Sequence, residues 1–183
     1  SVAVVGVGEG MPLVLIKQGI ESLREVPGRL ERIEAGQNFH VFVDYAHTED
    51  ALRNVLSSIR AVKKTRVIVV FGCGGDRDKS KRPRMASVVE ELSDFAIITT
   101  DNPRTEDPQQ IVDEIVGGFK SKNFNVVLYR SQAIAQALAL ANKDEVVLIA
   151  GKGHEDYQIF KDKKIAFDER KIVAQSIAAL GKF

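Results

Sequence analysis

Short apolar runs recur along the 183-residue chain and alternate with longer segments of helical periodicity. The runs are rich in Val and Ile and almost continuous, which is typical of strands buried on both faces of a parallel sheet. They occupy residues 39–45, 66–72, 95–100, 124–130 and 145–151. Between and after them, apolar residues recur every three or four positions, which predicts helices over 48–64, 81–94, 108–120, 131–142 and 168–183. Strands and helices in this order predict an α/β domain with a doubly wound, mostly parallel sheet.

A different pattern follows the last of these strands. Residues 157–162 and 163–170 predict two short strands that turn on Asp162-Lys163. We therefore expect one antiparallel hairpin at the edge of the sheet.

The start of the chain is also organised differently. Residues 12–23 predict a helix with no strand beside it, and Pro27-Gly28 then breaks the chain. We interpret residues 1–26 as the end of a preceding domain and residues 27–183 as the sheet domain. The chain lacks an initiator Met, so we expect a piece of a longer protein.

Composition narrows the class of protein only a little. The net charge of +1 gives no general attraction to nucleic acid or to a membrane surface. The single cysteine, Cys73, excludes an internal disulfide and fits a reducing compartment. No apolar stretch approaches the roughly 20 residues that a membrane helix needs. We expect a cytoplasmic protein that binds neither nucleic acid nor membrane.

Four polar clusters each follow a predicted strand. They are DYAHT (44–48), GCGGDRDKSKR (72–82), DNPRTEDP (101–108) and AGKGHEDYQ (150–158). Because ligands of open parallel sheets bind beyond the carboxyl ends of the strands, these clusters predict a site on one rim of the sheet.

The first two clusters suit anionic and hydroxyl groups of a ligand. Asp44 can accept two hydroxyls such as those of a ribose, and His47 precedes a helix N-terminus, where anions collect. The alternative is that Asp44 and Thr48 only cap the helix. The glycines of 72–75 allow other groups to approach the backbone, and Arg77 and Lys79 follow them, which suits an anion. The spacing matches neither a Walker A loop nor GxGxxG, and a tight turn with solvated charges is the alternative.

The other two clusters suit a zwitterion. Arg104 is a rigid fork for a carboxylate. Asp101 can take an ammonium, although on spacing alone an Asp101–Arg104 turn is more often structural. In the last cluster, glycines allow a close approach and Glu155 can meet a cation; a metal at His154 is a weaker interpretation. The four clusters together indicate a zwitterionic ligand beside a phosphate-bearing one.

Five segments in their order and intervals resemble the Mur ligase family, and within it the MurE type: VPGRLE (26–31), VDYAHT (43–48), FGCGGDRDKSKRP (71–83), DNPRTEDP (101–108) and AGKGHEDYQ (150–158). The resemblance covers nearly the whole chain. It implies a Rossmann-like C-terminal domain, preceded by the last helices of a central ATPase domain. The family's P-loop is absent from this sequence, so ATP and Mg²⁺ are expected to be bound mostly by the central domain.

The resemblance also implies an activity and a set of site residues. The full-length protein would be an ATP-dependent peptide ligase that adds meso-diaminopimelate to UDP-MurNAc-L-Ala-D-Glu in peptidoglycan precursor synthesis, and the domain alone would be inactive. By the match, the residues that bind diaminopimelate are Arg77, Asp101, Asn102, Arg104, Gly151 and Glu155. Those near the nucleotide are Arg29, Asp44, Tyr45, His47 and Lys79. His47 is the one catalytic candidate, and no metal ligand is expected.

Arg104 is the residue expected to determine which amino acid is used. In the family, the arginine of DNPR marks enzymes that add meso-diaminopimelate rather than L-lysine. Diaminopimelate has an additional carboxylate, and an arginine left without that partner would cost on the order of 1–3 kcal/mol or more. An L-lysine-adding ligase is therefore one alternative. A non-catalytic nucleotide-binding Rossmann module, which needs only the glycine-rich loop and the helix caps, is another.

Overall fold

The computed structural model of the chain describes residues 7–22 and 28–181. Its centre is a six-stranded sheet with the strand order β1-β2-β6-β3-β4-β5. Strands β2 to β6 are parallel to one another, and β1 is antiparallel to β2. The strands are β1 (Glu31–Ile33), β2 (His40–Asp44), β3 (Val67–Phe71), β4 (Phe95–Ile98), β5 (Phe124–Val126) and β6 (Val146–Ala150). The predicted doubly wound, mostly parallel sheet is confirmed.

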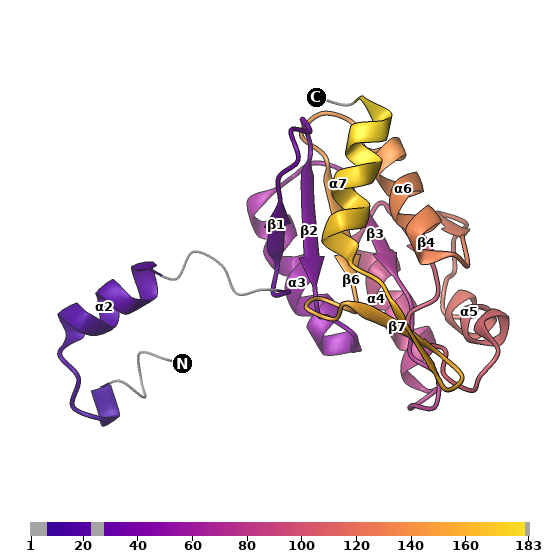
Figure 1. Ribbon diagram of the computed structural model, residues 1–183, viewed down its shortest axis with the longest axis horizontal. Helices are drawn as coiled ribbons and strands as arrows, with labels where there is room; N and C mark the ends of the chain where they lie inside the picture. Colours follow the sequence, from indigo (N-terminus) through magenta and orange to yellow (C-terminus); the bar gives the residue numbers. More distant parts are fainter. Residues whose placement is uncertain (1–6, 23–27, 182–183) are drawn as a thin grey trace.

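Helices cover both faces of this sheet (Figure 1). Helices α3 (Glu49–Val62), α4 (Lys81–Leu92) and α5 (Pro108–Val116) pack on one face, and α6 (Arg130–Leu140) and α7 (Glu169–Leu180) pack on the other. Along β3, Val67, Val69 and Phe71 join the first core, whereas Ile68 and Val70 join the second. All five β3 side chains are buried, which explains why the strand is continuously apolar.

Two helices begin where the sequence places their caps. The Thr48 side chain accepts a hydrogen bond from Ala51 N at the start of α3. The Asp107 side chain accepts from Gln109 N, and Pro108 occupies the first turn of α5. These caps satisfy backbone donors that a helix start leaves unpaired, and they fix the ends of the two preceding loops.

The predicted hairpin is present as β7 (Tyr157–Phe160) and β8 (Lys163–Ala166). It forms a two-stranded sheet of its own, and its turn lies one residue earlier than predicted, with Lys161 at φ 53°. The hairpin docks on Arg104, which donates from its backbone N to Ile159 O and accepts from Lys161 N. The antiparallel edge of the main sheet is instead β1, which at three residues is too short for a periodic signal.

The N-terminal helix is α2 (Leu13–Ser22), in agreement with the helix expected over 12–23. The expected domain boundary at 26–27 lies outside the described residues. None of the helices in the described ranges has the length and apolar character that a membrane crossing requires.

Candidate functional site

The four polar clusters meet at one rim of the sheet. Asp44 at the end of β2 pairs in register with Ala150 at the end of β6. Phe71 at the end of β3 is likewise opposite Ile98 at the end of β4. Because these four strands are parallel, the segments that follow them leave the sheet on the same side, as predicted.

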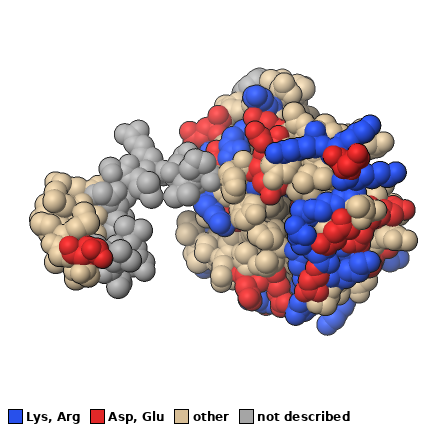
Figure 2. Space-filling model, turned by 60° about the horizontal axis from the view of Figure 1, so that its bottom comes forward, with Lys and Arg blue, Asp and Glu red and all other residues tan. Residues whose placement is uncertain are grey.

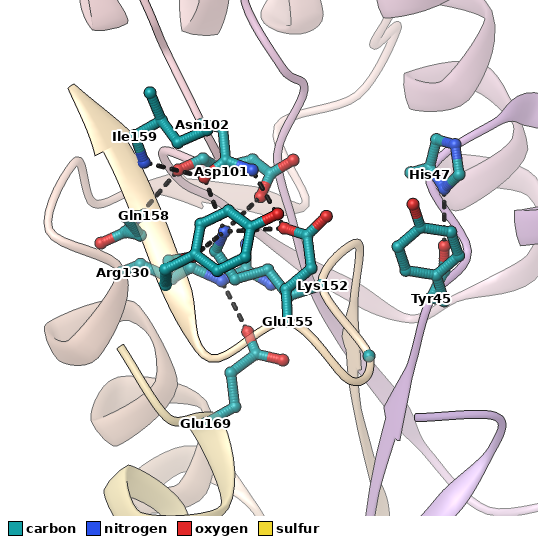
Figure 3. A network of polar contacts seen from close by, with 12 residues as sticks. Tyr45, His47, Asp101, Asn102, Arg130, Lys152, Glu155, Gln158, Ile159 and Glu169 are labelled. Atoms are coloured by element: carbon teal, nitrogen blue, oxygen red, sulfur yellow. Dashed lines mark hydrogen bonds and ion pairs between the residues drawn. The ribbon is translucent and has the colours of Figure 1, made fainter. Parts of the chain in front are cut away.

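A buried ammonium stands at the centre of this rim (Figure 3). The Lys152 side chain is 0 % exposed, and its Nζ donates to Asn102 Oδ1 at 2.9 Å and to Tyr157 O at 2.8 Å. Its ion-pair partners are Asp101 Oδ1 at 3.0 Å and Glu155 Oε2 at 3.5 Å. Asn102 completes the network by donating from Nδ2 to Glu155 Oε2 at 3.0 Å. Three predicted site residues are thus brought together by a lysine that the sequence analysis missed.

A second buried ion pair lies beside this network. Arg130 Nε donates to Glu169 Oε1 at 2.7 Å, and both side chains are fully buried. Arg130 also donates to Ala150 O at 2.8 Å. Burial raises the pKa of Glu169, and the Arg130 charge opposes that rise. Gly151, which follows Ala150, has φ 122°. A Cβ placed on Gly151 would lie 3.8 Å from Arg130 Nη2 and 4.0 Å from Asp101 Cγ.

Arg104 has an unusual backbone and a partly free side chain. Its φ of 52° is in the left-handed region, and its Nη1 donates to Gly75 O at 2.8 Å. It forms no ion pair with any described residue, so the suggested Asp101–Arg104 pair does not form; Asp101 is paired with Lys152. A Cβ placed on Gly74 would lie 2.9 Å from Arg104 Nη1 and 4.0 Å from Arg77 Cγ. The two predicted carboxylate-binding arginines therefore flank the same glycine.

A surface pocket of about 260 Å³ lies where Arg104 meets the hairpin. Its lining is Pro103, Arg104, Glu106, Pro108, Phe160, Lys161, Asp162 and Lys163. Of the predicted site residues, only Arg104 reaches this pocket. Asn102 and Glu155 instead contact Lys152, and Arg77 lies beside Gly74.

The glycine-rich loop after β3 is held against the DNPR loop by charges. The buried Arg82 donates to both oxygens of Glu106 at 3.0 Å and to Glu114 at 2.8 Å. The Arg82 hydrogen bonds lower the pKa of Glu106 to about 2. Lys79 lies 3.2 Å from Glu106, so this predicted nucleotide residue stands beside the DNPR loop. Asp76 adds a hydrogen bond from Thr105 Oγ1 at 2.7 Å.

The glycines of this loop serve a purpose other than the expected one. A Cβ on Gly75 would lie 1.9 Å from Pro103 O, and one on Gly72 would lie 2.1 Å from Thr99 O. Both distances are impossible for real atoms, so glycine is required at these two positions by the neighbouring segment after β4. Gly74 is different, because its nearest neighbour is the Arg104 side chain.

Rings and a cation form the other end of the rim. The Tyr45 ring centroid lies 4.5 Å from that of His47, 5.1 Å from that of His154 and 5.0 Å from Arg29 Cζ. Asp44 is buried, with Oδ2 accepting from Leu30 N at 2.6 Å and Oδ1 from Ala46 N at 2.7 Å. Three of the predicted nucleotide residues are thus grouped, and Asp44 binds the backbone next to Arg29 and Tyr45.

The GKGHE loop joins the two ends of the rim. Lys152 and Glu155 belong to the buried network, whereas His154 belongs to the group of rings. A Cβ on Gly28 would lie 2.2 Å from His154 N, so Gly28 packs directly on this loop. Tyr45 and His47 lie apart from the Lys152 network across the loop (Figure 3).

Charge at the surface is mixed in sign. On the face shown in Figure 2, basic and acidic side chains alternate and form no large field of one sign. Among residues 7–22 and 28–181, no three His, Cys, Asp or Glu side chains are grouped so that they could hold a metal ion.

Comparison with known proteins assigns the chain to a family of ligases. The family model described as "Mur ligase, glutamate ligase domain" matches residues 28–153, and the chain belongs to the Mur ligase family. The chain is 52% identical over 176 residues to the UDP-N-acetylmuramoyl-L-alanyl-D-glutamate--2,6-diaminopimelate ligase of Clostridium tetani, covering 95% of the chain and 36% of that protein. The ligase of the same name from Clostridium botulinum is 50% identical over 171 residues, with coverages of 92% and 35%. The resemblance to the C-terminal domain of the MurE type is confirmed.

Solved structures agree with this assignment. A structure titled with the same ligase name superposes with a TM-score of 0.80 at 34% identity, over 99% of this chain and 37% of that one. Escherichia coli FolC in complex with ADP has a TM-score of 0.62 at 21% identity, over 93% and 35%, and shows the fold alone. The chain spans about a third of the length of the curated relatives it matches.

Proposed function

We propose that this chain is the C-terminal domain of an ATP-dependent ligase that adds meso-diaminopimelate to UDP-N-acetylmuramoyl-L-alanyl-D-glutamate in the cytoplasm. Residues 27–183 would bind the amino acid, and residues 1–26 would end a central ATPase domain. The names of the relatives support this substrate. The observation that carries it is Arg104, a guanidinium beside Arg77 with no carboxylate partner in the described chain.

The arrangement suits both charges of an amino acid. Arg77, Asn102 and Arg104 would take carboxylates, and Asp101, Gly151 and Glu155 would surround the distal ammonium. The carboxylates of Asp101 and Glu155 lie on either side of Lys152, which offsets one of their two charges. One unit of negative charge is left to attract an ammonium.

The domain would act by positioning. In the proposed reaction, ATP transfers its terminal phosphoryl group to the γ-carboxylate of the D-glutamyl residue and leaves as ADP. The amine of diaminopimelate then attacks the carbonyl carbon of this acyl phosphate, loses a proton and expels inorganic phosphate. Holding the amine in line with that carbon makes the attack effectively unimolecular, which supplies much of the rate enhancement. His47 is the one side chain proposed for proton transfer.

The ring cluster is the proposed contact for the nucleotide. Arg29, Tyr45 and His47 present a cation and two rings on which an adenosine group can stack. Asp44 and Lys79 complete the proposed set, although Asp44 already accepts two backbone donors and Lys79 already pairs with Glu106. In the proposed full-length ligase, ATP and Mg²⁺ would be held mainly by the central domain.

Amino-acid selection tests the proposal. The full-length ligase should release ADP with meso-diaminopimelate and far less with L-lysine, because lysine leaves Arg104 without a partner. Arg104→Ala should lower kcat/KM for diaminopimelate by roughly 10- to 150-fold, the value of a charged hydrogen bond. Arg32→Ala, at an exposed arginine on β1, is the matched control.

Each alternative predicts a different result. An L-lysine-adding ligase would prefer lysine in the wild-type enzyme. A non-catalytic nucleotide-binding module would release no ADP with either amino acid. Full activity of Arg104→Ala would refute the role given to Arg104.

A further inference from the structure

We propose that Lys152 is a positioning residue for amino-acid recognition, which fixes the orientation of the Asn102 amide and the net charge of the group formed with Asp101 and Glu155. The proposal rests on the proposed function. The Lys152 side chain is 0 % exposed, whereas the side chains of Asp101 and Glu155 are 10 % and 17 % exposed. It can therefore act on a bound amino acid only through Asp101, Asn102 and Glu155.

The hydrogen bonds of Lys152 also exclude direct contact with a ligand. An ammonium has three N–H donors. Asn102 Oδ1 at 2.9 Å and Tyr157 O at 2.8 Å use two of them. The third N–H group lies near two carboxylates, Asp101 at 3.0 Å and Glu155 at 3.5 Å from Nζ. No donor is left for a substrate, so Lys152 is neither a catalytic acid nor a direct ligand contact.

Lys152 determines which way the Asn102 amide faces. Asn102 Oδ1 accepts from Lys152 Nζ and from Ile159 N at 3.0 Å. An amide nitrogen in that position would place its own protons against two donors, which is unfavourable. The Nδ2 group is consequently turned toward Glu155, to which it donates at 3.0 Å. A fixed donor at this position suits a carboxylate of the ligand.

Lys152 also sets the charge that the ligand meets. Asp101, Lys152 and Glu155 carry two negative charges and one positive charge, so their sum is −1. One ammonium of the ligand brings the group to neutrality. Without Lys152, two largely buried carboxylates would repel each other, and the Asn102 amide would lose the donor that orients it.

Kinetics of the full-length ligase provide the first test. Lys152→Met should raise KM for meso-diaminopimelate about ten-fold or more, and KM for ATP should change by less than about two-fold. A purely structural lysine would affect both substrates together. Lys143→Met, at an exposed lysine after α6, is the matched control and should leave both values unchanged.

A double-mutant cycle separates the proposed charge effect from a general loss of folding in Lys152→Met. Lys152→Met/Asp101→Asn keeps the net charge of −1, so it should unfold at a higher urea concentration than Lys152→Met alone. In the Asp101→Asn background, the effect of Lys152→Met on the amino-acid KM should also be smaller than in the wild type. Additive effects on both quantities would refute the inference.

The Asn102 amide gives a direct readout in this 183-residue chain. In NMR spectra of this chain, the two Asn102 Nδ2 proton signals can be assigned by their loss in Asn102→Asp. In Lys152→Met/Asp101→Asn these signals should shift and their protons should exchange faster with water. In Lys143→Met neither change is expected. A wild-type ligase that used neither amino acid would refute the proposed function. An active wild type whose folded Lys152 variants kept the same amino-acid KM would refute this inference alone.

Discussion

The two ends of the rim are built from different interactions. At the end proposed for the amino acid, buried ion pairs connect the loops: Lys152 pairs with Asp101, Arg82 with Glu106, and Arg130 with Glu169. At the end proposed for the nucleotide, the side chains of Arg29, Tyr45, His47 and His154 make ring and cation contacts near the surface, and none of the four forms an ion pair within the described residues. The first end is thus held by buried ion pairs among its own residues, whereas the second presents partly exposed rings and a cation.

This difference fits the tasks proposed for the two ends. Selecting one zwitterion over another requires polar groups in fixed positions, because discrimination comes from partners left unpaired. A stacking surface needs less precise placement, because ring faces accept a range of geometries. Each variant below weakens one end of the rim.

The largest loss of stability is expected for Glu169→Gln. The variant leaves the fully buried Arg130 without its counter-charge, which should cost about 3–5 kcal/mol of unfolding free energy. The measurement is urea denaturation of this chain. The exposed Arg53–Glu91 pair offers a matched control, since Glu91→Gln removes the same charge at the surface and should hardly change the midpoint. Equal losses in the two variants would contradict the importance given to burial.

Glu106→Gln should come next, at about 2–4 kcal/mol, because Arg82 is buried and keeps only Glu114 as a counter-charge. The effect has a defined pH dependence. The pKa of Glu106 is lowered from 4.5 to about 2, so its contribution is complete above pH 4.5 and is lost as the pH falls toward 2. Denaturation curves of wild type and variant should therefore converge in acid. A constant difference down to pH 2 would show that the Glu106 charge is not the cause.

Sequence reasoning succeeded where burial and chain direction follow from local pattern. The strands of residues 66–72 and 145–151 were predicted because both faces are buried, which gives continuous apolar runs. The position of the site followed from parallel strand direction alone, since every polar cluster after a strand must reach the same rim. These two inferences need no knowledge of distant contacts.

The buried cations were missed for a physical reason. Charged residues are mostly exposed, so nothing local distinguishes Lys152, Arg82 or Arg130 from surface cations. Their partners are also distant in sequence: Asn102 is 50 residues from Lys152, and Glu169 is 39 residues from Arg130. The one available signal was the pair of glycines around Lys152, both with positive φ, which mark a backbone in close contact with other segments.

For the glycines after β3, sequence reasoning assigned a ligand-binding role where the structure shows contacts with a neighbouring loop. They were expected to admit a ligand, and the spacing after a strand supports that interpretation equally well. Pro103 and Thr99 instead occupy the space beside Gly75 and Gly72. Sequence indicates that something approaches the backbone, but not whether it is a ligand or the neighbouring loop.

The smallest change in stability is expected at the nucleotide end. Tyr45→Ala removes ring contacts with His47 and His154 and the contact with Arg29, each worth at most about 1 kcal/mol at a partly exposed site. Unfolding in urea should therefore shift by only about 1–2 kcal/mol. Tyr129→Ala is the matched control, since Tyr129 is 73% exposed.

The same variant should have a clear effect on nucleotide use. In the full-length ligase, loss of a stacking ring should raise KM for ATP several-fold, by roughly 5-fold for about 1 kcal/mol, and leave KM for the amino acid unchanged. Lys152→Met is expected to do the reverse, so the two variants separate the ends of the rim. If Tyr45→Ala instead raised only the amino-acid KM, the GKGHE loop that joins Tyr45 to Lys152 would be transmitting the change, and the two ends would act as one site.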